Sequence, residues 1–167
     1  ELVPGFPDLD VDAVYLGNGV SELIMLTMQA LLDDGDEVLI PAPDYPLWTA
    51  AVSLAGGTPV HYRCDENDGW NPDLADMAAK VSARTKAVYS PEVLAGVAEL
   101  AREHELLLLA DEIYDRILYD GASHTSVASL APDQLCITYN GLSKTYRVAG
   151  YRSGWMAITG AGPGIMA

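Results

Sequence analysis

The chain has 167 residues, half of them hydrophobic, and nine Lys and Arg against 24 Asp and Glu give it a formal net charge of -15. This length and composition predict one compact unit with a sizeable core and exclude a mainly disordered protein. The acidic balance disfavours partners with phosphate backbones and anionic lipid surfaces, so we expect no nucleic-acid or membrane role. Two widely spaced cysteines, Cys64 and Cys136, form neither a disulfide framework nor a metal-ligand pattern. We therefore expect a soluble, cytoplasmic protein.

The first half of the chain alternates between strand and helix patterns. The expected elements are a strand over 14–19, a helix over 21–32, a strand over 37–40, a proline-rich loop over 41–46, a helix over 47–54, a strand over 59–63 and a helix over 73–81. Pro72 suits the first turn of the last helix. The order strand, helix, strand is typical of a parallel sheet.

The second half continues the alternation. An amphipathic helix is predicted over 90–104, with Ser90 as its N-cap and Pro91 as its first helical residue. The run over 106–110 is apolar on both faces, as a central parallel strand must be. Further strands are expected over 135–139 and 154–159. The predicted fold class is α/β, a mostly parallel sheet with helices on both faces.

One junction does not fit this pattern. Between the helix ending near Val81 and the helix expected from Ser90, only residues 86–89 resemble a strand. At about 3.3 Å per residue so short a run covers less than a typical strand and its loop. Either the two helices form a simple hairpin, or sequence is absent at Ala87-Val88.

The segment over 140–155 is the most specific in the chain. It follows a predicted strand and is rich in glycine, where parallel α/β sheets place ligand loops. Lys144 supplies an amine that can form an imine, and Arg152 supplies a bidentate partner for phosphate. Taken alone, the pair could equally be a solvated surface lysine and arginine.

Two other segments can reach the same crevice. Asp111 and Tyr114 follow the strand over 106–110, where a carboxylate can pair with a protonated ring nitrogen and a phenol can bond a phenolate oxygen. The glycine turn over 17–21 opens a helix, which offers free backbone N–H groups and the Ser21 hydroxyl to an anion. By itself this turn is weak evidence for an anion site, because ordinary turns have the same sequence pattern.

Four motifs in order resemble class I/II aminotransferases of the PLP-dependent fold type I, and most closely the alanine (glutamate–pyruvate) aminotransferase group. The motifs are Gly-Asn-Gly-Val-Ser-Glu, Pro-Ala-Pro-Asp-Tyr-Pro-Leu-Trp, Asp-Glu-Ile-Tyr and Gly-Leu-Ser-Lys-Thr-Tyr-Arg-Val-Ala-Gly-Tyr-Arg. The resemblance implies pyridoxal 5′-phosphate (PLP) as cofactor and transamination between an L-amino acid, alanine or glutamate, and a 2-oxo acid, 2-oxoglutarate or pyruvate. It also implies a homodimer and a role in amino-acid biosynthesis.

The resemblance assigns roles to individual residues. Lys144 would hold PLP as the internal aldimine and act as the catalytic base. Asp111 would pair with the pyridinium nitrogen, Tyr114 would bond the 3′-oxygen, and Tyr45 would stack on the ring. The phosphate would lie against the remaining positions, so the cofactor-binding set is Gly19, Val20, Ser21, Tyr45, Asp111, Tyr114, Ser143, Lys144 and Arg152. No metal site is expected.

The chain also departs from the family pattern. The family's Asn-Pro-x-Asn-Pro-Thr-Gly segment does not occur in it, and the expected place is Ala87-Val88, where the strand pattern is also short. The expectation is therefore that residues 1–167 form part of the large PLP-binding domain, with a strand and this loop missing near 87–88. The N-terminal arm and the small C-terminal domain are expected to be absent as well.

Other functions remain open at this point. The PLP residues do not specify the reaction, so a β-lyase or another PLP-dependent chemistry is possible. An aminotransferase-like PLP-binding sensor or a degenerate inactive fragment is a non-enzymatic alternative. An unrelated nucleotide-binding α/β domain would rest on Gly17-Asn-Gly19 alone.

Overall fold

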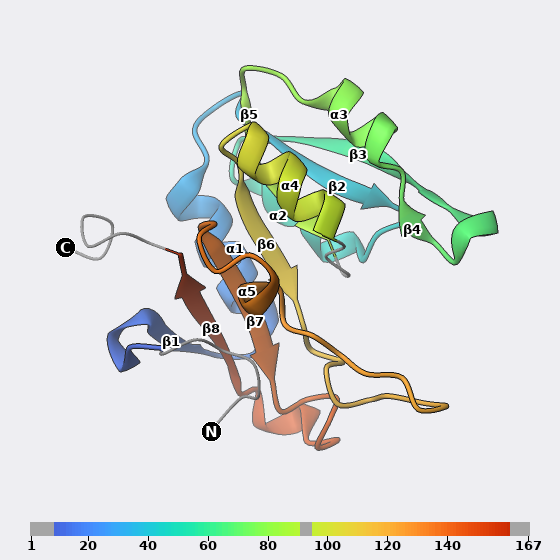
Figure 1. Ribbon diagram of the computed structural model, residues 1–167. Helices are drawn as coiled ribbons and strands as arrows, with labels where there is room; N and C mark the ends of the chain where they lie inside the picture. Colours follow the sequence, from blue (N-terminus) through green and yellow to red (C-terminus); the bar gives the residue numbers. More distant parts are fainter. Residues whose placement is uncertain (1–8, 91–94, 161–167) are drawn as a thin grey trace.

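The computed structural model describes residues 9–90 and 95–160, and its centre is one eight-stranded sheet (Figure 1). The strand order is β1-β8-β7-β6-β5-β2-β3-β4. The five strands β2, β3, β5, β6 and β7 are parallel, while β1, β4 and β8 pair antiparallel with their neighbours. The strands are β1 Val14–Gly17, β2 Glu37–Ala42, β3 Thr58–Asp65, β4 Asn71–Pro72, β5 Thr85–Ser90, β6 Leu107–Asp111, β7 Cys136–Gly141 and β8 Gly154–Thr159. The mostly parallel α/β sheet is confirmed.

Helices cover both faces of this sheet (Figure 1). One face carries α1 and α2, and the other carries α3, α4 and α5. The helices are α1 Val20–Leu31, α2 Pro46–Leu54, α3 Leu74–Lys80, α4 Ala95–Glu103 and α5 Val127–Leu130. Three 3₁₀ turns lie at Val11–Ala13, Glu66–Asp68 and Ala149–Tyr151. Among the residues described, no helix is long and apolar enough to cross a membrane.

The apolar run of β6 explains why both faces need a cover. Leu108 packs into the cluster under α3, α4 and α5, whereas Leu109 points to the cluster under α1 and α2. Both side chains are fully buried, and burying a leucine contributes about 1.5–3 kcal/mol. Successive side chains of a strand alternate between faces, so an uninterrupted leucine run is stable only between two helical layers.

Three boundary expectations need correction. Pro72 belongs to β4 rather than to the first turn of α3, because Asp73 is the N-cap and its carboxylate accepts from the N–H groups of Ala75 and Asp76. The loop expected from Pro41 begins later, since β2 continues through Ala42. The third expectation concerns Ser90, which is the last residue of β5. The expectation for Pro91 falls outside the described residues.

A strand spans the Ala87-Val88 junction, contrary to the expectation that one is missing there. β5 pairs in parallel with β2 on one side and with β6 on the other. Its register against β2 shifts between Glu37 and Val38. The strand includes Ser90, although the helical pattern predicts Ser90 as the start of the next helix. Residues 85–90 are therefore all part of the sheet. The Asn-Pro-x-Asn-Pro-Thr-Gly segment itself does not occur in the sequence, and its original place at 87–88 stays a prediction.

Candidate active site

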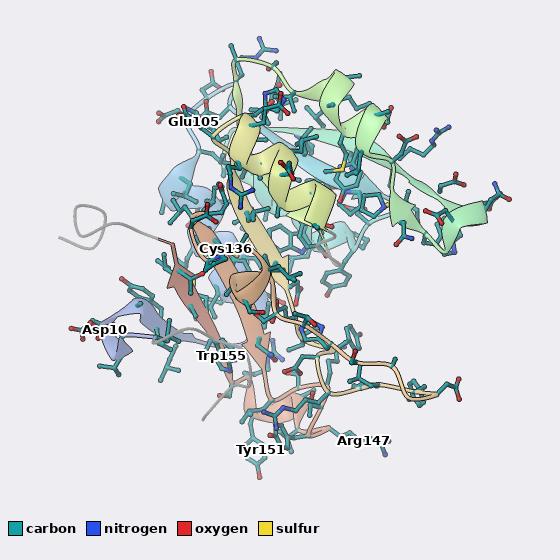
Figure 2. The ribbon with its side chains drawn as sticks, in the orientation of Figure 1. Asp10, Glu105, Cys136, Arg147, Tyr151 and Trp155 are labelled. Carbon is teal, nitrogen blue, oxygen red and sulfur yellow. The ribbon has the colours of Figure 1, made fainter. Side chains whose placement is uncertain are left out.

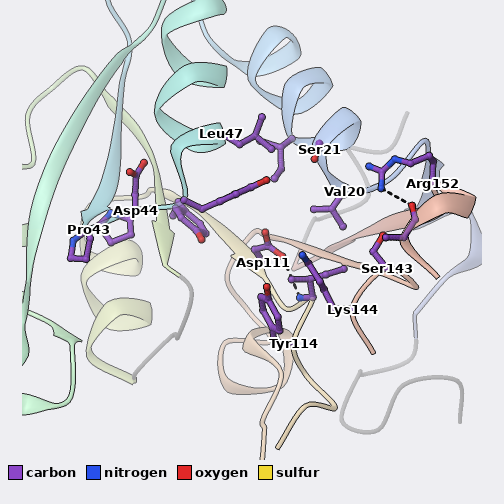
Figure 3. Close-up of a pocket in the computed structure, with 16 residues that line it drawn as sticks. Val20, Ser21, Pro43, Asp44, Leu47, Asp111, Tyr114, Ser143, Lys144 and Arg152 are labelled. Atoms are coloured by element: carbon purple, nitrogen blue, oxygen red, sulfur yellow. Dashed lines mark hydrogen bonds between the residues drawn. The ribbon is translucent and has the colours of Figure 1, made fainter. Parts of the chain in front are cut away.

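A cavity of about 460 Å³ opens where the carboxyl ends of the parallel strands meet the start of α1 (Figure 3). This is the edge at which open α/β sheets bind ligands. Eight of the nine sequence-predicted residues line it: Val20, Ser21, Tyr45, Asp111, Tyr114, Ser143, Lys144 and Arg152. The ninth, Gly19, is the N-cap of α1 beside Arg152. The structure thus brings together four segments that lie far apart in the sequence.

The start of α1 forms an anion cradle. Gly19 has a φ of 81°, a left-handed value that favours glycine, and no side chain caps the helix N–H groups. A Cβ at Gly19 would collide with the Arg152 guanidinium. A Cβ at Gly154 would lie 2.6 Å from the Val20 nitrogen. The two glycines therefore allow β8 and Arg152 to approach a helix N-terminus whose dipole favours negative charge.

Arg152 supplies the fixed cation of the cradle. It follows the 3₁₀ turn Ala149–Tyr151 with a φ of 48°, and its Nη1 donates to the Ala149 carbonyl at 3.1 Å. Figure 3 shows the side chain reaching back toward the α1 start. Two other side chains of the same segment, Arg147 and Tyr151, point outward, away from the molecule, in Figure 2. A guanidinium held in this way can bind a phosphate through two parallel hydrogen bonds.

Lys144 lies in the turn that follows β7, with its amine in the cavity. Its Nζ is 5.8 Å from the centroid of the Tyr114 ring, within range of a cation–π contact. Figure 3 shows Lys144 beside Asp111 and Tyr114. An amine, a carboxylate and a phenol thus share one wall, while Tyr45 lies at the mouth with more than half of its surface exposed.

Asp111 ends β6 and is the perturbed acid of the cavity. Its Oδ1 accepts from the Ile113 N–H at 3.2 Å. Burial raises the pKa of its carboxyl to about 6, although Ile113 and Lys144 favour the charged form. A carboxylate held in poor solvation is ready to pair with a cation that enters the cavity.

Sequence reasoning missed part of the lining. Tyr89 reaches the cavity from the end of β5, and Asp44 and Leu47 flank Tyr45. Behind them Trp48 is fully buried against Tyr89. Trp48 stood inside a recognised motif, whereas Tyr89 gave no signal because its place depends on the strand formed at Ala87-Val88.

A lysine amine, a strand-end carboxylate, a phenol and an anion cradle thus meet around one cavity of the α/β sheet. The chain belongs to the aminotransferase class I and II family, whose model matches residues 6–161. Pyridoxal 5′-phosphate is the cofactor of this family. Its phosphate, aldehyde, pyridine nitrogen and ring hydroxyl each have a suitable partner here: the cradle, Lys144, Asp111 and Tyr114.

Named relatives agree with this assignment. The alanine aminotransferase of Mycobacterium tuberculosis (strain ATCC 25618 / H37Rv) is 68% identical over 96% of this chain and 40% of its own length. The glutamate-pyruvate aminotransferase AlaA of Escherichia coli (strain K12) is 59% identical over 93% and 42%. The crystal structure of an Escherichia coli aminotransferase superposes with a TM-score of 0.91 at 56% identity, covering 96% of this chain and 43% of that one. The chain therefore spans about two fifths of the length of the relatives it matches.

The alignments also contain a gap. The match to the Mycobacterium tuberculosis relative runs over 172 residues, yet 96% of this chain is only about 160. For the AlaA relative the match runs over 168, against about 155 residues of this chain. About a dozen aligned positions thus have no counterpart in this chain.

Proposed function

We propose that this chain binds PLP through Lys144 and takes part in transamination between L-alanine or L-glutamate and 2-oxoglutarate or pyruvate. The observation that carries the proposal is the meeting of Lys144, Asp111 and Arg152 around one cavity. The names of the relatives, alanine aminotransferase and glutamate-pyruvate aminotransferase, support this substrate pair. When bound, the cofactor supplies an electron sink that stabilises negative charge at the substrate Cα.

The residues of the wall would carry out the proton chemistry. The Nζ of Lys144 would attach the cofactor and then take the proton from the substrate Cα. The Asp111 carboxylate would hold a proton on the pyridine nitrogen, and the Tyr114 hydroxyl would donate to the ring oxygen. Tyr45, at the mouth, would stack on the ring and shield one face from water.

The cradle would hold the phosphate. The backbone N–H groups at Val20 and Ser21 end a helix dipole, and the hydroxyls of Ser21 and Ser143 add donors. Arg152 would neutralise one phosphate charge. The net charge of -15 does not oppose this binding, because the donors act at contact distance while the acidic surface is screened by salt.

Absorbance spectroscopy tests the proposal. Incubation with PLP should produce the band of the lysine-attached cofactor, and Lys144→Ala should abolish it. Lys80→Ala is the matched control, because Lys80 is paired with Asp76 on α3, and it should leave the band unchanged. Addition of L-alanine or L-glutamate should then convert the band, whereas D-alanine should not. A band that persists in Lys144→Ala would refute the proposal.

A second candidate is a chain that binds PLP without catalysis. It is favoured by the dozen aligned positions that have no counterpart here, about the size of the asparagine loop with part of a strand. The same experiment separates the two functions: a Lys144-dependent band that neither amino acid converts would support the non-catalytic binder.

We also propose that the protein acts as a homodimer in the cytoplasm, within amino-acid biosynthesis. The support is the family resemblance, together with two cysteines that are both free in the described structure. Sedimentation at several protein concentrations tests the dimer.

A further inference from the structure

Trp48 carries a hydrogen-bond donor that the fold does not use. The residue lies on α2 and is fully buried. Its ring stacks on Tyr89 with centroids 3.9 Å apart and planes 12° apart, and it meets the edge of Tyr139 at 5.6 Å. Among the described residues its Nε1–H has no hydrogen-bond partner. A buried donor that is left unpaired is unfavourable, so it needs an explanation.

The surroundings show where this donor is directed. Tyr89 and Asp111 line the cavity from the ends of neighbouring strands, and Trp48 packs directly behind Tyr89. Trp48 also contacts the edge of Tyr139, the register partner of Asp111 in the β6–β7 pair. The indole N–H opposes the burial that raises the pKa of Asp111, and it acts in the same way on Tyr89. The donor therefore lies on the side of the sheet from which Asp111 and Tyr89 line the cavity.

We propose that Trp48 is a positioning residue, whose indole N–H donates to Asp111 and, together with the Ile113 N–H, holds the carboxylate toward the ring nitrogen of the bound cofactor. This inference rests on the proposed function, since it assigns a support to Asp111. Two donors behind a carboxylate keep it ionised and restrict its rotation.

The conservative variant is Trp48→Phe, which keeps an aromatic ring against Tyr89 and loses only the N–H. We expect the dissociation constant of PLP at pH 6 to rise about tenfold, the usual effect of losing a hydrogen bond to a charged group. The acid side of the affinity profile should move to higher pH, because Asp111 loses a donor to its ionised form. The other charged or titratable groups that act on Asp111 are Glu112 and Lys144, and the tyrosines Tyr89 and Tyr139 face it from the neighbouring strands.

The matched control is Tyr139→Phe, which removes the hydroxyl of another buried, unpartnered side chain in the same aromatic cluster. It should change the affinity less than twofold. In an Asp111→Asn background, Trp48→Phe should have no further effect, because its action passes through the carboxylate. An equal loss in both backgrounds, or an equal loss in Tyr139→Phe, would overturn the inference and leave a packing role.

The unaltered chain offers a measurement that needs no Trp48 variant. The three tryptophans give three indole N–H signals in a ¹⁵N-labelled NMR spectrum, and Trp70→Phe and Trp155→Phe identify the remaining one. The Trp48 signal should titrate with Asp111 and move on addition of PLP, and both changes should vanish in Asp111→Asn. An unresponsive signal would overturn the inference while a Lys144-dependent PLP band leaves the proposed function standing. Absence of that band would overturn both.

Discussion

Asp111 shows the conflict between stability and binding at the scale of one residue. The buried carboxylate is poorly solvated, and its pKa rises to about 6 from an ordinary value near 4 although Lys144 lies beside it. A raised pKa means that the folded state favours the protonated form. The contribution of Asp111 to stability is thus complete below about pH 4 and is lost as the pH rises through about 6.

Asp111→Asn should therefore stabilise the cofactor-free protein at neutral pH. A difference of about two pKa units corresponds to about 3 kcal/mol at pH 8, and to roughly half of that at pH 5. Urea unfolding of both proteins at the two pH values measures the difference. A variant that is equally stable at pH 8 would show that the carboxylate is better solvated than its burial indicates.

Gly19 is the second residue whose identity the site constrains. We expect Gly19→Ala to weaken PLP binding at least tenfold, because its methyl group would displace the Arg152 guanidinium from the cradle. The matched control is Gly35→Ala, which has a similar φ of 85° and nothing within 4 Å of the added atom. Both changes should cost about 1 kcal/mol in backbone strain, but only the first should raise the dissociation constant of PLP.

The site residues differ in how far the sequence could predict them. Lys144 and Arg152 lie in a glycine-rich segment where the fold itself requires neither side chain, so their presence there predicted a binding role. Trp48 stands in a recognised motif, but the sequence predicted no role for it, because a buried tryptophan is ordinary in a core. Only its unpaired N–H near Asp111 suggests a role. Such a property depends on tertiary packing and cannot be read from spacing.

At the scale of elements, β5 is tied to β2 by one buried carboxylate. Glu37, at the start of β2, accepts from the Ser82 hydroxyl at 2.6 Å and from Arg84 Nε and Nη2 at 3.0 and 2.6 Å. These donors, the Ser82 hydroxyl first, lower the pKa of Glu37. The cluster fixes the turn that leads into β5 at the point where the register shifts.

We expect Glu37→Gln to destabilise the protein by about 2 kcal/mol, since charge-assisted hydrogen bonds to a buried group are lost. A lowered pKa makes this stability present above about pH 4.3 and lost as the pH falls, so the difference should shrink in acid. Asp133→Asn breaks the exposed pair with Arg102 and should leave the free energy of unfolding nearly unchanged. Equal losses in the free energy of unfolding for the two variants, measured by chemical denaturation, would contradict the role assigned to Glu37.

The alternation of elements could be predicted because apolar periodicity is local. The boundary at Ser90 could not, because two demands compete for the same residues. The sequence Ser-Pro-Glu favours a helix start, whereas the central place between β2 and β6 requires a strand. β5 pairs with β2 at Thr85, Ala87 and Val88 and with β6 over residues 87–90, and this tertiary gain outweighs a local cap that contributes about 1 kcal/mol.

At the scale of the whole molecule, the predicted absence of the asparagine loop can be tested by restoring it. We expect an insertion of 12 residues between Ala87 and Val88, five apolar residues that continue β5 in place of 88–90 and then Asn-Pro-x-Asn-Pro-Thr-Gly, to lower the dissociation constant of PLP about tenfold, because an asparagine donor to the ring oxygen is added. An insertion of equal length made of glycine and serine is the control. Equal affinities of the two variants, measured by titration of the absorbance band, would contradict the prediction.

The pairing of β1 with β8 also bears on how the molecule folds. Gly17 faces Gly154 in this ladder, so the cradle joins opposite ends of the described chain. Contacts between residues so distant in sequence carry a large loop-closure entropy and form slowly. The anion cradle is therefore complete only when nearly the whole sheet has assembled. A nascent chain lacking β8 would have Lys144, but β8 would not yet hold Arg152 against the start of α1, and the cofactor would select finished molecules over folding intermediates.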